Sequence, residues 1–239
     1  MSRRRLGCYN VVMAKRKVPF APGEFYHLYH RGMDRRKVFL DENDYKRFIA
    51  LLYLCNNPNS VHLSDWWESP YDKLFNLNRR NTLVEIGTYC LMPNHFHLLV
   101  YEKEEKGIST FMQKLITAYS MYFNIKYIRT GGLFERPFKS QHVGDDNYLK
   151  YLFAYIHLNP VRIFDEELWE KKLISEFAVA KNFIDHYHFS SFLDYSRDDK
   201  RPCEIILNKN NFPDYFSTAK DFNDFIEYWM VNDDVKASP

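Results

Sequence analysis

The residues with the clearest chemical potential are two histidines, His95 and His97, separated by the apolar Phe96. The residues that follow, up to Tyr101, predict a β-strand, in which positions i and i+2 project from the same face. Both imidazoles therefore leave one face of the strand together, while Phe96 enters the other. Two neighbouring imidazoles can bind one metal ion. A His-x-His pair in a half-buried strand is more often structural, so metal binding by this pair is indicated only together with residues further along the chain.

The second pattern is a stripe on the helix that is predicted to end before Pro160. Its members are spaced by three, four and four residues: Tyr148, Tyr151, Tyr155 and Asn159. Buried tyrosines alone would be structural, but the amide oxygen of Asn159 can bind a divalent cation. Two imidazoles and one carboxamide carry no charge, so the metal keeps its full charge to polarise an anionic substrate such as a phosphate. Tyr155, one turn before Asn159, would then be placed as a nucleophile.

The elements that must position these residues follow from the spacing of apolar side chains. Four strands are predicted, at residues 25–30, 83–92, 95–101 and 138–143. Three helices are predicted, at residues 40–56, 107–128 and 146–159. Pro93 and Asn94 form a tight hairpin turn between the second and third strands. The order strand, helix, strand, strand, helix, strand predicts an α+β fold with a ferredoxin-like antiparallel sheet, and the third helix follows the last strand.

We divide the chain into a catalytic domain at residues 20–165 and a helical C-terminal extension at residues 166–239. Helical segments of the extension are predicted at residues 173–187, 203–207 and 216–230. Residues 58–80 have no clean period and contain two adjacent tryptophans and two prolines, so we predict a long loop or an insertion there.

The composition limits the class of protein. With 239 residues, 46% of them hydrophobic, the chain can bury a proper core. A net charge of +2 means that a nucleic-acid surface must come from local clusters of cations, such as a flexible basic arm at Arg3–Arg5. The four cysteines form no Cys-x-x-Cys pair, which favours reduced thiols and a cytoplasmic location. No apolar segment is long enough to span a membrane, so we expect no membrane partner.

Taken together, His95-Phe96-His97 and the segment Tyr155-Ile-His-Leu-Asn-Pro160 resemble the single-tyrosine HUH transposases, especially the REP-associated tyrosine transposases of bacteria. The segments 27–31, 92–97 and 132–140 carry the same resemblance. It extends from about Phe25 to Arg162, which is over half of the chain. Each motif is short and unspecific by itself, but their combination and order are specific. The tryptophan-rich insertion and the C-terminal extension depart from the family pattern.

The resemblance implies an HUH endonuclease or transposase fold in which His95 and His97 bind Mg or Mn and Asn159 completes the metal site. Because imidazoles also suit softer ions, the identity of the metal stays open. Tyr155 would attack a phosphate of single-stranded DNA, form a 5′-phosphotyrosine and free a 3′-hydroxyl that later rejoins strands. The expected partner is single-stranded DNA folded as a hairpin, bound by a monomer or a homodimer. Four cations are candidate DNA-phosphate contacts: Arg129, Arg136, Lys139 and Lys150.

Three other interpretations of the same residues remain open. A domesticated DNA-binding protein would keep the fold without mobility. A replication or relaxase-type nickase would use the same histidine pair. A purely structural ferredoxin-like module would do neither, and metal-dependent cleavage of hairpin DNA would exclude it.

Overall fold

The computed structural model describes residues 19–59, 69–76, 81–164 and 177–231. The basic arm at Arg3–Arg5, part of the segment 58–80 and the boundary drawn between residues 165 and 166 lie outside the described residues. In the described part of the chain, no helix has the length and apolar character needed to cross a bilayer.

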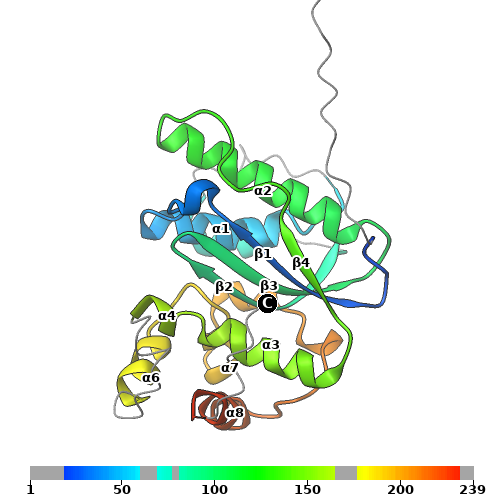
Figure 1. The fold of residues 1–239 in the computed structure, drawn as a ribbon, viewed down its shortest axis with the longest axis vertical. Helices are drawn as coiled ribbons and strands as arrows, with labels where there is room; N and C mark the ends of the chain where they lie inside the picture. The colour runs from blue at the N-terminus through cyan, green and yellow to red at the C-terminus, as the bar shows by residue number, and fades with distance from the viewer. Residues whose placement is uncertain (1–18, 60–68, 77–80, 165–176, 232–239) are drawn as a thin grey trace, which may run out of the picture.

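One antiparallel sheet of four strands, in the order β2-β3-β1-β4, forms the centre of the fold (Figure 1). The strands are β1 (Phe25–Arg31), β2 (Val84–Met92), β3 (His95–Glu102) and β4 (Lys139–Val143). Pro93 and Asn94 connect β2 to β3, as predicted. The chain order and the pairing confirm the predicted ferredoxin-like α+β fold.

Two helices, α1 (Glu42–Leu54) and α2 (Gly107–Lys126), cover one face of the sheet (Figure 1). α1 begins after Asp41, whose carboxylate accepts a hydrogen bond from the backbone N–H of Asp44 in a capping box. Phe96 lies in the core between this face and the helices. A short 3₁₀ turn, η1 (Met33–Arg35), follows β1.

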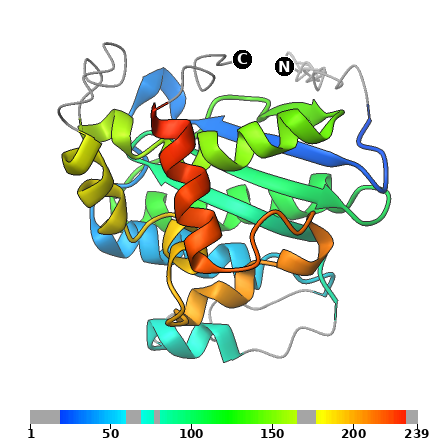
Figure 2. The ribbon, with the colours of Figure 1, turned by 90° about the horizontal axis from the view of Figure 1, so that it is seen from below.

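The opposite face of the sheet is covered by α3 (Asp146–Leu158) and by the C-terminal extension (Figures 1 and 2). The short helix α4 (Val161–Phe164) follows α3 directly. The described helices of the extension are α6 (Phe177–Asp185), α7 (Phe192–Ser196) and α8 (Ala219–Val231), with 3₁₀ turns η5 (Pro202–Ile206) and η6 (Lys209–Asn211). In Figure 2, α8 lies across the sheet next to α3.

One contact between the extension and the sheet depends on a glycine. Gly87 lies at a register shift in β2, between Ile86 and Thr88. A Cβ atom at Gly87 would lie 2.5 Å from a ring carbon of Phe212, so only a glycine lets this ring lie against the strand. Phe212 belongs to the same hydrophobic core as α3.

Residues 151–158 of α3 are all buried, because the sheet covers one side of the helix and the extension covers the other. Within the segment 58–80, predicted as a long loop or an insertion, Tyr71–Asn76 form a 3₁₀ helix, η3, whose Leu74 and Phe75 are buried. Phe75 packs edge-to-face on Tyr53 of α1, a long-range contact that local periodicity does not reveal.

Candidate active site

β3 presents His95 and His97 on the face that α3 covers, as the strand alternation predicts. Their ring centroids are 4.9 Å apart. His95 is half-buried and its Nδ1 lies 2.6 Å from Oδ1 of Asn94, whereas His97 is only 5% exposed. Burial, helped by the nearby charges of Arg31 and Arg162, lowers the pKa of His95 to about 4 and moves the pKa of His97 well below its usual value. Both imidazoles are therefore neutral near pH 7, which is the form that binds metals.

The helix α3 places Tyr155 directly beside this pair. The Tyr155 ring is perpendicular to the His97 ring, with 5.6 Å between the centroids. The guanidinium carbon of Arg162 lies 5.2 Å from the centre of the Tyr155 ring. Because all three side chains belong to one chain, no second subunit is needed to bring Tyr155 to the histidines.

An open pocket of about 780 Å³ joins these residues. Among the side chains that line it are His95, His97 and Tyr155. Five cationic residues also line it: Arg31, Arg35, Lys37, Lys139 and Arg162. Glu135 is the one acidic residue in the described lining. The pocket therefore combines a strongly positive wall with two neutral imidazoles and a phenol, a combination that suits a phosphate-bearing substrate.

The histidine pair fits a divalent metal ion. His97 Nε2 is buried and has no hydrogen-bond partner in the described structure, although it belongs to a residue that lines the pocket. Buried polar atoms are rarely left without a partner, and a functional ligand is one reason for an exception. Within the described residues, no group of three or more His, Cys, Asp or Glu side chains could hold a metal. A third protein ligand from the described part of the chain would therefore be of another type.

Asn159, the predicted third ligand, is the C-cap residue of α3 and is only 2% exposed. Its amide nitrogen donates to the backbone carbonyl of Tyr155 at 2.8 Å, which leaves the amide oxygen as the atom that could bind a cation. Asn159 is not among the residues that line the pocket, whereas His95, His97 and Tyr155 are.

The family model described as "Transposase IS200 like" matches residues 25–159, from the start of β1 to the end of α3. The chain belongs to this family. The matched residues include both histidines and Tyr155, so the family predicted from the motifs is confirmed. A solved structure of a REP-associated tyrosine transposase bound to a REP hairpin aligns with this transposase at a TM-score of 0.48 and 12% identity, over 86% of this chain and 96% of that chain. No curated protein matches the sequence of this transposase significantly.

The four predicted DNA contacts of this transposase lie in different surroundings. Lys139 is exposed and lines the pocket. Arg136 is exposed but lies outside the lining. Arg129 lies over the ring of Phe123 at the end of α2. Lys150 forms an ion pair of 2.8 Å with Asp146 on the same helix.

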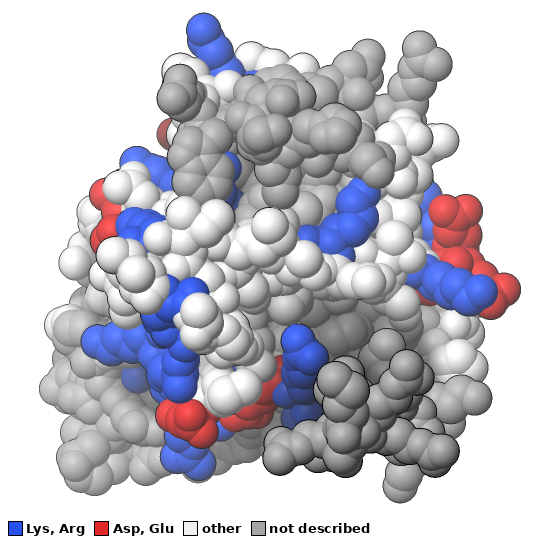
Figure 3. All heavy atoms as spheres, turned by 90° about the horizontal axis from the view of Figure 1, so that it is seen from above, with Lys and Arg blue, Asp and Glu red and all other residues white. Residues whose placement is uncertain are grey.

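Sequence reasoning missed four of the five cations that line the transposase pocket, among them Arg31 and Arg162. Arg31 follows His27 by four strand positions and therefore projects from the same face; it lies opposite His95 in the β1–β3 ladder. Arg162 follows Tyr155 by seven residues, or two helical turns, but the sequence predicts that the helix ends before Pro160. Elsewhere, the face in Figure 3 carries separate groups of Lys and Arg with Asp and Glu between them, in keeping with a net charge of only +2.

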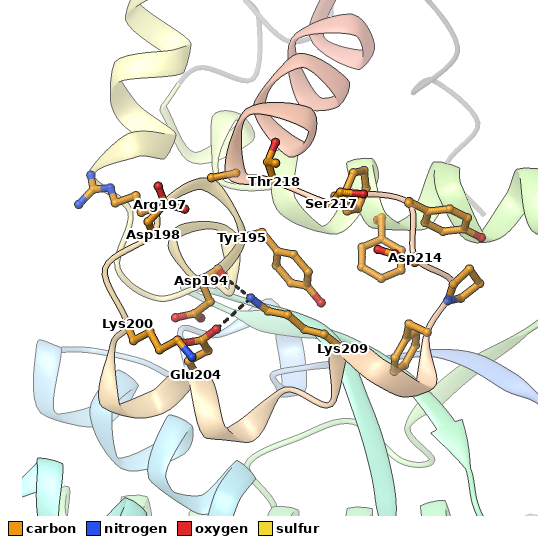
Figure 4. Close-up of a pocket in the computed structure, with 16 residues that line it drawn as sticks. Asp194, Tyr195, Arg197, Asp198, Lys200, Glu204, Lys209, Asp214, Ser217 and Thr218 are labelled. Atoms are coloured by element: carbon orange, nitrogen blue, oxygen red, sulfur yellow. Dashed lines mark hydrogen bonds and ion pairs between the residues drawn. The ribbon is translucent and has the colours of Figure 1, made fainter.

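A second pocket of the transposase, of about 300 Å³, lies between α3, α7 and the segment that leads into α8 (Figure 4). One of its cations is already bonded within the pocket: Lys209 donates to Glu204 and to the backbone carbonyl of Asp194. This pocket has no histidine in its described lining. We therefore place the candidate active site in the larger pocket beside β3.

Proposed function

We propose that this IS200-like transposase cleaves and rejoins single-stranded DNA, folded as a hairpin, through a 5′-phosphotyrosine on Tyr155. The observation that carries the proposal is the 5.6 Å separation between the rings of Tyr155 and His97 inside one positively charged pocket. The family match supports DNA strand transfer as the general activity.

In the proposed reaction, the Tyr155 hydroxyl oxygen attacks the scissile phosphorus. A Tyr155 Oη–P bond forms, the P–O3′ bond breaks, the phenolic proton passes to solvent and the leaving 3′-oxygen takes up a proton from solvent. Attack by a 3′-hydroxyl on the phosphotyrosine reverses these changes and restores the tyrosine. The bond energy is retained in the phosphotyrosine, so the strands can be rejoined without ATP.

His95 and His97 would hold a divalent ion, and Asn159 is the candidate for a further ligand. Such an ion, Mg or Mn in the proposal, supplies Lewis-acid neutralisation of a non-bridging phosphate oxygen. The chain's own residues contribute the rest. Tyr155 belongs to α3 and is only 5% exposed, so packing holds its ring in place at the wall of the pocket.

The cations that line the pocket support the proposed DNA partner. Arg31 and Lys139 are exposed and face the pocket from neighbouring strands, and Arg162 faces it from α4. Guanidinium groups form paired hydrogen bonds with phosphate oxygens, so Arg31 and Arg162 join Lys139 as proposed DNA-phosphate contacts. Arg129, Arg136 and Lys150, the other predicted contacts, would touch DNA only beyond the pocket.

The decisive experiment is trapping of the covalent adduct. The protein is incubated with a labelled DNA hairpin that carries a single-stranded flank, in the presence of Mg²⁺ or Mn²⁺, and the adduct is detected on a denaturing gel. Tyr155→Phe should abolish the adduct and leave hairpin binding intact. Tyr151→Phe is the matched control, because Tyr151 lies one turn earlier with its ring 5.7 Å from that of Tyr155.

Loss of the adduct in Tyr151→Phe but not in Tyr155→Phe would show that the nucleophile is misassigned. Hairpin binding with no adduct in the wild-type protein would favour a domesticated DNA-binding protein instead. Cleavage without rejoining of a supplied 3′-hydroxyl strand would favour a nickase.

A further inference from the structure

A third histidine, His27 on β1, contacts His97. Its Nε2 lies 2.9 Å from Nδ1 of His97, within hydrogen-bonding distance. The two rings are stacked, with 5.1 Å between centroids and 17° between planes. His27 is 1% exposed, so water does not compete for this contact. The hydrogen bond therefore fixes the orientation of the His97 ring.

The proton in this hydrogen bond decides which nitrogen of His97 is open to a metal ion. A neutral imidazole has one N–H and one lone pair, so either ring can be the donor. If His97 donates from Nδ1, its Nε2 keeps a lone pair. If His27 donates instead, Nε2 of His97 carries the hydrogen and cannot bind a metal. The outer nitrogens of the pair, His97 Nε2 and His27 Nδ1, are both buried without a partner in the described structure.

We propose that His27 is a positioning residue that accepts the Nδ1–H of His97 and so holds the Nε2 lone pair toward the metal site. This inference rests on the proposed metal site of His95 and His97. Metal-binding histidines generally donate their second N–H to a fixed acceptor, most often a carboxylate or a carbonyl. An imidazole acceptor orients the ligand without adding negative charge. The bound ion thus keeps its full charge for the phosphate.

The fold supports this role. His27 and His97 lie on adjacent antiparallel strands, where Tyr29 is the residue directly opposite His97, so the contact is a diagonal one across the ladder. The His27 ring also lies 5.9 Å from the ring of Tyr155. A single side chain therefore supports the proposed metal ligand and packs against the proposed nucleophile.

The test measures Mn²⁺ binding by calorimetry on the full chain without DNA. His27→Leu should weaken binding by about 10- to 100-fold, the usual effect of removing a partner of a metal ligand. His27→Gln should stay near the wild-type affinity, because its side-chain oxygen can accept the same hydrogen bond. His142→Gln is the control, since His142 lies on the outer strand β4, is exposed and is hydrogen-bonded to Glu24.

A second readout is the ¹⁵N spectrum of the metal-free protein with labelled histidines. We expect His97 to carry its hydrogen on Nδ1, and the opposite tautomer would overturn the inference. Equal Mn²⁺ affinity of wild type and His27→Leu would overturn it too, as would equal losses in His27→Leu and His27→Gln. Absence of Mn²⁺ binding in the wild type would overturn the metal site itself, and the role of His27 with it.

Discussion

Removing the guanidinium of Arg162 should slow formation of the covalent DNA adduct more than it weakens DNA binding. Its carbon lies 5.2 Å from the centre of the Tyr155 ring, and the side chain is half-buried in the pocket wall. A cation over an aromatic ring contributes about 0.5–2 kcal/mol. A charged hydrogen bond to a phosphate oxygen adds about 1.5–3 kcal/mol. Their sum of about 2–5 kcal/mol corresponds to a loss of roughly 30-fold to a few thousand-fold in rate.

The assay is single-turnover adduct formation at saturating hairpin DNA, with binding measured separately by fluorescence anisotropy. Arg162→Ala should show the full loss. Arg162→Lys should fall between the two, because lysine keeps the charge without the planar fork that pairs with phosphate oxygens. A folded Arg162→Ala protein that forms the adduct within about twofold of the wild-type rate would refute the reasoning.

Chelation of divalent metal, or His97→Ala, should stop cleavage while hairpin binding persists; unchanged cleavage in chelator would contradict the metal assignment. Gly87→Ala should lower the free energy of unfolding by about 1–3 kcal/mol, because its Cβ would lie 2.5 Å from the ring of Phe212. Chemical denaturation measures the change, and adding Phe212→Leu should recover part of it. Lys139→Ala should reduce the slope of log affinity against log salt by about 1. Lys103→Ala, at the far end of β3, should leave the slope unchanged.

Strand alternation was sufficient to predict which face of β3 carries the histidines. The period of two depends only on the local backbone, so His95 and His97 had to share a face and Phe96 had to enter the opposite core. The position at which α3 begins also depends only on neighbouring residues. Asp145 caps the helix by accepting a hydrogen bond from the backbone N–H of Tyr148, as its position before an apolar repeat predicts.

Helix amphipathicity was a poorer guide, because it assumes that one side of a helix meets water. α3 is covered on both sides, since the extension packs against the side that the sheet does not reach. The tyrosine stripe of α3 was predicted from helical spacing, but part of its cover comes from far along the chain, since Tyr151 packs against Trp229 of α8. Sequence spacing carries no information about such a cover.

Which of the candidate side chains share a face could be predicted from short motifs, because the spacing of His95 and His97, and of Tyr155 and Asn159, is set by strand and helix geometry alone. Which residues line the pocket could not be predicted from these motifs. Arg31 reaches it because β1 pairs with β3, and His27 meets His97 across the same ladder. Arg162 reaches Tyr155 because the chain continues as a short helix beyond Pro160. The contacts between β1 and β3 join segments that are far apart along the chain, so they arise only when the sheet assembles. The contact of Arg162 depends instead on the path of the chain just after Pro160.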